Sequence, residues 1–460
     1  MPSSADVEPV ATLVRPRKTQ PSARPPWRGL TIAAVAGLVA WMAFQFLPYA
    51  AEPRKGLALL IFIGILWLTE AFHVSITALL VPVGSVLLGF EDFGTTKALA
   101  AFADPVIFLF FGGFALATAL HAQRLDHKIA LGLLAAASGR MGIASLYLFL
   151  ATAGLSMWIS NTATAAMMLP LALGLLAELR NEDRNTKVFL LLGIAYSASI
   201  GGLGTLVGSP PNAIAARALD MDFAGWMRIG LPLMAFLLPV MLVVLYALFR
   251  PKFGERVSIA EVHIPWTSSR IMALVLFLVT ALAWIFSGNL SRWLNITSAD
   301  TVIALMAAIL VVALGLATWR QIAENTDWGV LYLFGGGLTL SAVLRASGAS
   351  AVLGQQVAVL VGGTSPFVMY LIVAIFIVYL TEFTSNTASA ALLVPVFAAI
   401  AEQMGLPPKI LVLMIGLGAS LAFMLPVATP PNAIVFATGH VRQREMLRAG
   451  VVLYISCAVL

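Results

Sequence analysis

The sequence predicts an all-α polytopic membrane protein, and three observations support this prediction. The chain has 460 residues, of which 60% are hydrophobic and only 10% charged, and its mean hydropathy is +0.95. Because a soluble domain carries roughly a quarter charged residues, most of this surface must avoid water. Apolar runs of about 20 residues, long enough to cross a bilayer as a helix, recur along the chain. The alternating pattern that is typical of membrane strands is absent.

The apolar runs follow one another with short polar connections between them. They fall near 29–51, 54–72, 74–91, 100–122, 188–218, 225–250, 269–289, 299–319, 326–346, 408–438 and 444–460. Two further regions, 141–180 and 365–402, each contain an apolar helix, a polar break and a second helix. The shorter stretches that precede these regions, 124–138 and 349–363, are predicted to be interfacial helices. Residues 1–28 are polar and rich in Pro and Arg, which predicts a disordered cytoplasmic tail.

The positions of the basic residues predict the orientation of the chain. Its net charge is +6, and in a membrane protein such an excess indicates cytoplasmic loops rather than nucleic-acid binding. If the N-terminus is cytoplasmic and each helix–break–helix region returns to its own side, most of the 27 Lys and Arg residues are cytoplasmic. Five crossings then separate the two regions, so the first opens from the cytoplasm and the second from outside. We therefore predict a multi-pass protein of the cell's inner (plasma) membrane, with a cytoplasmic N-terminus, surrounding lipid and no nucleic-acid partner.

Three sequence patterns occur twice, in the same order. "FGG" at 111–113 returns at 334–336, "SNTATAAMMLP" at 160–170 returns as "SNTASAALLVP" at 385–395, and "VGSPPNAI" at 207–214 returns as "VATPPNAI" at 427–434. The offsets of 223, 225 and 220 residues indicate an internal duplication, with halves near 55–250 and 270–460. Because an odd number of crossings separates them, the repeats are inverted. Inverted repeats are common in transporters, whose binding sites lie at the repeat interface.

The two Ser-Asn-Thr tripeptides are polar breaks in apolar surroundings. Residues 160–162 follow one apolar helix and precede another, and residues 385–387 do the same. Ser, Asn and Thr are good N-caps for the following helix, while the preceding helix ends with unpaired carbonyls. Each break therefore presents partly negative carbonyls beside partly positive amides, an arrangement suited to holding a small cation and an anion side by side.

The double prolines predict two further breaks. Pro210-Pro211 and Pro430-Pro431 cannot continue a helix, so each membrane segment must unwind and then restart. Unwound backbone at membrane depth persists only where protein, ions or water satisfy it. The two tripeptides and the two unwound helices therefore predict a pair of cation sites that flank one anion site.

Acidic residues in the apolar segments are few, namely Glu70, Asp104, Asp327 and Glu382. Asp104 and Asp327 are predicted to cap helices, Glu70 to lie near the interface, and Glu382 to support a site rather than to bind a ligand. No Lys or Arg lies in either paired motif, so an anionic substrate would depend on helix amides and co-bound cations. The sequence has no phosphate-binding loop, nucleophile motif or metal-ligand spacing, so we expect neither an enzyme nor an organic cofactor.

These motifs resemble those of the divalent anion–sodium symporter (DASS) family of di- and tricarboxylate transporters. The resemblance rests on the paired "SNT" tips, each followed by a "PPN" unwound helix, and covers roughly residues 55–460. It implies about 11 transmembrane helices, two re-entrant helical hairpins, a homodimer and an elevator-type mechanism. It also implies sodium-coupled uptake of C4-dicarboxylates such as succinate, malate or fumarate into the cytoplasm.

The resemblance further implies a role for each motif residue, with sodium as the coupling ion. The first sodium site would use Ser156, Ser160, Asn161 and the carbonyl of Gly208. The second would use Thr381, Ser385, Asn386 and the carbonyl of Ala428. The substrate carboxylates would meet Asn161, Thr162 and Ser209 on one side and Asn386, Thr387, Thr429 and Pro430 on the other.

The same resemblance divides the chain into fixed and moving parts. The scaffold would comprise 29–91 and 225–319, the second of which would contain the dimer contact. The transport domain would comprise 100–222 and 326–442, and 444–460 would be a terminal helix.

Other functions remain open at this stage. A member of the family could exchange dicarboxylates without sodium, or select citrate or sulfate, because selectivity depends on side chains around the motifs. A non-transporting sensor would need a cytoplasmic signalling domain, and a channel would conduct without saturation.

Overall fold

The structure, a computed structural model, describes residues 26–91, 93–178, 183–254, 264–361 and 365–458. Within these ranges the regular structure is helical, with α-helices and two short 3-10 helices and no strand. The predicted all-α class is therefore confirmed. The predicted tail 1–28 lies outside the described residues except for its last three, and these belong to the first turn of a helix that begins at Pro26.

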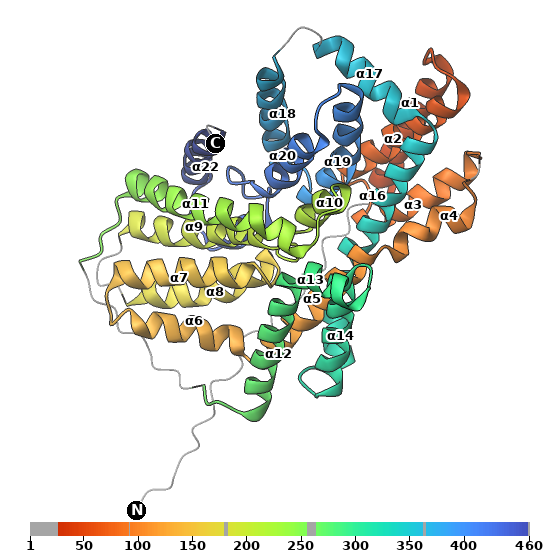
Figure 1. The fold of residues 1–460 in the computed structure, drawn as a ribbon. Helices are drawn as coiled ribbons and strands as arrows, with labels where there is room; N and C mark the ends of the chain where they lie inside the picture. The colour runs from red at the N-terminus through yellow and green to blue at the C-terminus, as the bar shows by residue number, and fades with distance from the viewer. Residues whose placement is uncertain (1–25, 92, 179–182, 255–263, 362–364, 459–460) are drawn as a thin grey trace, which may run out of the picture.

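Figure 1 shows the helices in chain order. The first are α1 (Pro26–Phe46), α2 (Ala51–Leu68), α3 (Val74–Leu87), α4 (Thr95–Ala100) and α5 (Pro105–Ala122). Then come α6 (Leu125–Ala136), α7 (Met141–Ser156), α8 (Asn161–Ala177), α9 (Arg184–Gly201) and α10 (Pro210–Ala218). The middle of the chain forms α11 (Phe223–Phe249), α12 (Ser268–Ile285), α13 (Ser287–Leu294), α14 (Ala299–Ala313) and α15 (Trp319–Asn325). The last are α16 (Trp328–Ala346), α17 (Ala349–Val361), α18 (Pro366–Thr381), α19 (Asn386–Gln403), α20 (Pro408–Ser420), α21 (Pro430–Phe436) and α22 (Gln443–Ala458).

Several of the described helices are long and apolar enough to cross a membrane. By length and composition these are Trp27–Phe46, Thr95–Ala122, Arg184–Gly204, Phe223–Phe249, Ser268–Ile285 and Trp328–Ala346. Helices α13 and α14 would form another crossing as a pair, but the chain bends by 99° between them. The predicted total of about 11 crossings stays a prediction, since other apolar helices are shorter than a bilayer requires.

The two helix–break–helix regions form helical hairpins, α7–α8 and α18–α19. At each tip the predicted cap is present: the Ala163 amide donates to Ser160 Oγ at 3.3 Å, and the Ala388 amide donates to Ser385 Oγ at 3.4 Å. Helices α7, α8 and α18 have 16 or 17 residues, fewer than the about 20 that a crossing needs.

The double prolines mark two interruptions, which we call the first break (residues 202–209) and the second break (residues 421–429). After α9 the chain makes a short 3-10 helix, Gly202–Gly204, and is extended at Ser209 (φ −148°) before Pro210 starts α10. After α20 it leaves helical geometry at Leu421 and is extended at Thr429 (φ −139°) before Pro430 starts α21. The unwinding predicted from the prolines is therefore confirmed in both repeats.

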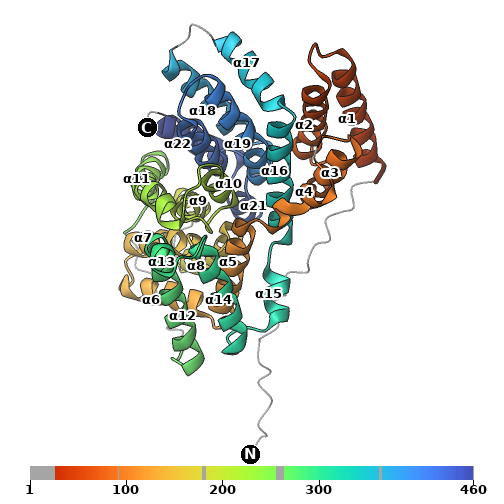
Figure 2. The same ribbon diagram turned by 45° about the vertical axis from the view of Figure 1, so that its right-hand side comes forward.

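The repeats exchange their short helices. Helix α10, which follows the first break, packs against α19 and α20 of the second repeat, whereas α21, which follows the second break, packs against α8 and α9 of the first. In the turned view, α10 and α21 lie near the centre of the molecule (Figure 2). This exchange brings both hairpin tips and both breaks to the middle of the molecule.

Two groups of helices surround this centre. One apolar core joins α7, α8, α9, α11 and α22, which lie side by side in Figure 1 apart from the last. The other joins the second hairpin with α2, α3, α5, α14 and α16. Within this second core, α5 packs along α14, and α16 packs along α3.

Candidate functional site

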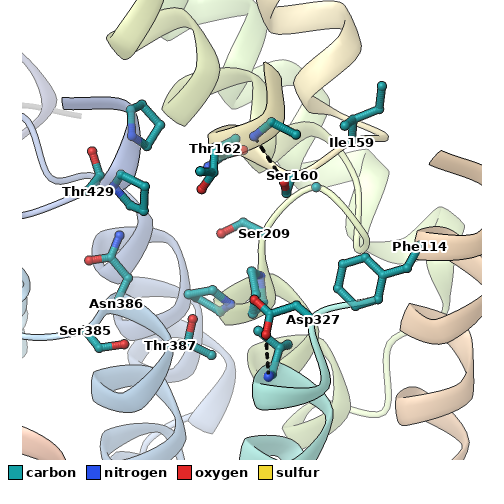
Figure 3. Close-up of a pocket in the computed structure, with 18 of the residues that line it drawn as sticks. Phe114, Ile159, Ser160, Thr162, Ser209, Asp327, Ser385, Asn386, Thr387 and Thr429 are labelled. Carbon is teal, nitrogen blue, oxygen red and sulfur yellow. Dashed lines mark hydrogen bonds between the residues drawn. The ribbon is translucent and has the colours of Figure 1, made fainter. Parts of the chain in front are cut away.

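Both tripeptides and both Pro-Pro motifs line one cavity of about 1160 Å³. Figure 3 shows the side chains of Thr162, Ser209, Asn386, Thr387 and Thr429 around this space, although they come from four separate segments of the chain. The predicted convergence of the repeated motifs is therefore observed, with Ser160, Asn161, Ser385, Gly208, Ala428 and Pro430 also in the lining. The remaining predicted site residues, Ser156 and Thr381, are fully buried directly behind it.

In the first repeat, oxygen atoms converge where α7 ends. Ser156 Oγ lies 2.7 Å from the Ala198 carbonyl and 2.6 Å from the Asn161 side-chain amide. The Asn161 atom that faces Ser156 is also 3.2 Å from the carbonyl oxygens of both Ala198 and Gly208. As nitrogen it donates to both carbonyls, whereas as oxygen it adds a further acceptor to the cluster. An oxygen in this position would join the Ser156 hydroxyl and the two carbonyls as a ligand for a small cation.

The second repeat reproduces this arrangement. Thr381 Oγ1 lies 2.6 Å from Asn386 Oδ1 and 2.8 Å from the Ala419 carbonyl. A hydroxyl has a single proton, so it cannot satisfy both acceptors fully. Each cluster therefore has more acceptor oxygens than protons to satisfy them, and hard oxygen atoms of this kind are suitable ligands for a small cation. The chemistry of the clusters around Asn161 and Asn386 fits sodium. The carbonyls of Ala198 and Ala419 belong to these clusters and were not predicted.

Each break is fixed by an asparagine that sequence reasoning did not select. Asn212 Nδ2 donates to the carbonyls of Gly202 and Thr205 at 2.8 and 2.7 Å. Asn432 Nδ2 donates to the carbonyls of Ala422 and Leu425, at 3.1 Å each. Both side chains are fully buried. These asparagines are the "N" of the repeated "PPNAI" pattern, so the signal was present in the sequence.

The predicted substrate residues differ in how they are held. Thr162 is exposed to the cavity and Thr387 is half-buried there. Ser209 is 5% exposed, and its hydroxyl lies 3.0 Å from that of Ser420 in the other repeat. Thr429 caps α21, because its Oγ1 accepts from the Asn432 amide at 3.3 Å. Thr162 and Thr387 are therefore the hydroxyls most available to a ligand.

The electrostatics of the cavity favour an anion only together with cations. Among the described residues that line it there is no Lys or Arg, whereas Glu70, Asp126 and Asp327 are present. Helices α8, α10 and α19 begin at the cavity, and their N-terminal amides provide partial positive charge. Asp327 also caps α16, as predicted, since its Oδ1 accepts from the Val330 amide at 3.2 Å.

A cluster at the edge of the cavity was missed from the sequence. Asp126 is 1% exposed and lies 2.8 Å from His121 Nδ1 and 3.2 Å from His127 Nδ1. Burial raises the pKa of Asp126, but the hydrogen bonds from His121 and His127 outweigh it and lower this pKa to about 2. The cluster spans the turn at Arg124 (φ 55°), so it fixes the angle between α5 and α6. The three residues are close in sequence, but their spacing alone does not show that Asp126 is buried and contacts both histidines.

Inverted repeats with broken helices, which meet at a central cavity, define a secondary transporter. Comparison with known proteins specifies the family. Residues 27–460 match the family model for the sodium:sulfate symporter transmembrane region. The chain belongs to this family, the divalent anion–sodium symporters, and is a transporter rather than an enzyme.

Two curated relatives illustrate the similarity. An uncharacterized transporter from Haemophilus influenzae is 56% identical, with 91% of this chain and 92% of the relative covered. The sodium-dependent dicarboxylate transporter SdcS from Staphylococcus saprophyticus is 34% identical, with 86% of this chain and 82% of the relative covered.

Solved structures show the same kind of fold. The YdaH transporter from Alcanivorax borkumensis superposes with a TM-score of 0.56 at 17% identity, covering 88% of this chain and 97% of that protein. MtrF from Neisseria gonorrhoeae gives a TM-score of 0.52 at 14% identity, covering 95% of this chain and 94% of that protein. At this level of identity the likeness concerns the fold alone.

Proposed function

We propose that this protein is a sodium-coupled symporter that takes C4-dicarboxylates such as succinate, malate or fumarate into the cytoplasm. One observation carries the proposal: two clusters of oxygen atoms, centred on Asn161 and Asn386, flank a single cavity whose described lining has no Lys or Arg. A dicarboxylate placed there needs positive charge near each carboxylate. Two sodium ions beside the helix N-termini provide it. The relative SdcS, which is named as a sodium-dependent dicarboxylate transporter, supports this choice of ions.

Sodium and substrate are coupled because each asparagine contacts both of them. Asn161 and Asn386 each offer an oxygen to a cation on the buried side and an amide to a carboxylate on the cavity side. Sodium on the buried side fixes the orientation of the side chain that the substrate meets. An anion without sodium would lie in a cavity with Glu70, Asp126 and Asp327 and with no Lys or Arg among the described lining residues. Binding of either ion alone is therefore unfavourable, and the two move together.

We further propose an elevator-type movement in a homodimer. The acidic residues at the edge of the cavity lie in segments that the charge distribution assigns to the cytoplasm, so this conformation would be inward-open. The moving part would be the predicted 100–222 and 326–442, with one refinement. Helix α5 packs along α14 and helix α16 packs along α3, and both partners belong to the predicted scaffold. We therefore assign α5 and α16 to the fixed scaffold.

Replacing sodium by choline is the direct test of the coupling. We expect succinate uptake into proteoliposomes with the purified full-length protein to fall to the level of empty liposomes when choline replaces external sodium. The physical reason is that the anion then lacks its counter-charges. Undiminished uptake in choline, in exchange for internal dicarboxylate, would identify a sodium-independent exchanger instead. Competition against labelled succinate by malate, fumarate, citrate and sulfate identifies the preferred anion, and displacement by sulfate alone contradicts the dicarboxylate proposal.

The two cavity threonines should govern substrate affinity more than sodium affinity. We expect Thr162→Ala or Thr387→Ala to raise the apparent KM for succinate by about 10- to 150-fold, because each loses one hydrogen bond to a charged group, worth about 1.5–3 kcal/mol. The sodium activation constant, measured at saturating succinate, should change less than twofold. Thr162→Ser and Thr387→Ser retain the hydroxyl and serve as controls. A shift confined to the sodium constant would reassign these residues to the cation sites.

A further inference from the structure

A buried carboxylate lies directly behind the second break. The side chain of Glu382 is 0% exposed, and backbone amides of the break surround it. Its Oε1 accepts from the amides of Phe423 and Met424 at 2.8 and 2.9 Å, and its Oε2 accepts from the amide of Leu425 at 2.8 Å. The hydroxyl of Tyr454 on α22 lies 2.5 Å from Oε1. The Tyr454 hydroxyl also lies against the carbonyl of Leu421, so its single proton is shared between two acceptors. Because three backbone amides donate to its two oxygens, Glu382 accepts these hydrogen bonds as a carboxylate.

These contacts connect the hairpin tip to the broken helix at the second cation cluster. Glu382 directly follows Thr381, whose hydroxyl belongs to that cluster. Leu425, whose amide donates to Glu382, accepts through its carbonyl from the Ala428 amide at 3.2 Å. Ala428 is the residue whose carbonyl is assigned to the second sodium. One carboxylate therefore fixes the position of a group at the end of α18 relative to a group in the second break.

The first repeat makes the corresponding connection without a charge. The repeat offset of 225 places Met157 opposite Glu382, and the offset of 220 places Thr205 opposite Leu425. Thr205 Oγ1 donates to the Met157 carbonyl and accepts from the Gly208 amide at 3.2 Å. A neutral hydroxyl thus occupies the place that the carboxylate and its amides occupy in the second repeat. The two cation clusters have similar oxygen atoms but different supports.

We propose that Glu382 is a positioning carboxylate that makes the second sodium site the tighter of the two. The proposal rests on the sodium-coupled function proposed above. Charge-assisted hydrogen bonds are roughly twice as strong as neutral ones, so the second break is held more rigidly than the first. A buried negative charge one residue from Thr381 also attracts a cation in a medium of low dielectric constant. Glu382 does not bind sodium itself, because its two oxygens already accept from three backbone amides.

The experiment measures sodium and substrate constants separately in the full-length protein. Sodium activation of succinate uptake in proteoliposomes gives the first constant, and KM for succinate at saturating sodium gives the second. Sodium-dependent thermal stabilisation of the purified protein without substrate gives an independent reading of cation binding. We expect Glu382→Gln to raise the sodium constant by about tenfold or more, because the new amide NH₂ faces backbone donors. KM at saturating sodium should change less than twofold, a split that a merely structural role would not produce.

The matched variant in the first repeat is Thr205→Val, which removes both neutral hydrogen bonds of the corresponding connection. It should raise the sodium constant by less than Glu382→Gln does. Glu382→Asp retains the charge but is one methylene too short to reach all of its donors. It should shift the sodium constant by a few fold, and it carries the test should Glu382→Gln not fold.

Each result is decisive. An unchanged sodium constant in Glu382→Gln or, if that variant does not fold, in Glu382→Asp overturns the role of Glu382 while leaving the proposed function intact. An equal or larger effect of Thr205→Val overturns the inequality of the two sites. Wild-type uptake and thermal stability that do not depend on sodium would instead remove the proposed function, and this inference with it.

Discussion

Asn161→Ala and Asn386→Ala are each expected to abolish sodium-dependent succinate uptake while leaving expression and folding intact. Each alanine removes a side-chain amide that lies between a buried oxygen cluster and the cavity. Hydrogen bonds to charged groups contribute about 1.5–3 kcal/mol each, so losing the cation and the anion contact together lowers uptake by a factor of about 100 or more. Initial rates in proteoliposomes, normalised to the amount of reconstituted protein, measure this loss.

Asn325→Ala is the control for these two variants. Asn325 also borders the cavity, but its amide donates to the Gln321 carbonyl of its own helix at 2.8 Å and contacts neither oxygen cluster. Its uptake should remain within twofold of that of the wild type. Near-normal uptake by Asn161→Ala or Asn386→Ala would show that the cavity binds its ligands elsewhere.

The local part of the site could be predicted because it is encoded by short polar signals in apolar surroundings. Ser160 and Ser385 cap α8 and α19 as predicted, and the double prolines start α10 and α21. These outcomes depend on the residue and its immediate neighbours, so a single sequence is sufficient. The repetition of the patterns added the long-range information that all of these segments meet.

What could not be predicted depends on atoms or contacts that have no local signature. The carbonyls of Ala198 and Ala419 complete the oxygen clusters, yet alanine is common throughout the chain and its side chain indicates nothing about its carbonyl. The contact between Ser209 and Ser420 joins residues 211 positions apart. Glu382 was predicted to support a site, but its donors are backbone amides of the second break, and their positions required the fold.

Helix lengths show the same limit. The apolar run 299–319 suggests one straight helix, but α14 ends at Ala313 and the chain turns at Gly315 (φ 65°). Composition defines which residues avoid water, whereas the point at which a helix ends depends on capping and packing. The number of crossings is therefore less predictable than the existence of the site.

Gly208→Ala should impair transport severely, although the repeat relationship alone would suggest a harmless change. The offset of 220 places Ala428 opposite Gly208, so the substitution merely gives the first repeat the residue of the second. The structure predicts otherwise, because a Cβ on Gly208 would lie 2.5 Å from the carbonyl oxygen of Gly202. That oxygen is held by Asn212 Nδ2 at 2.8 Å and cannot retreat without breaking this hydrogen bond. The clash would displace the Gly208 carbonyl from Asn161 and the first sodium.

Overpacking of this kind costs about 1–3 kcal/mol, which corresponds to roughly a 5- to 150-fold weaker sodium interaction at the first site. Sodium activation curves of succinate uptake should therefore shift to higher concentrations in Gly208→Ala. The mirror-image substitution, Ala428→Gly, only removes a methyl group and adds backbone freedom, which costs about 0.5–1 kcal/mol. It should weaken sodium by about fivefold at most. Equal effects of the two variants would mean that the breaks are interchangeable, and that the closer approach of Gly202 in the first repeat has no bearing on how sodium is held.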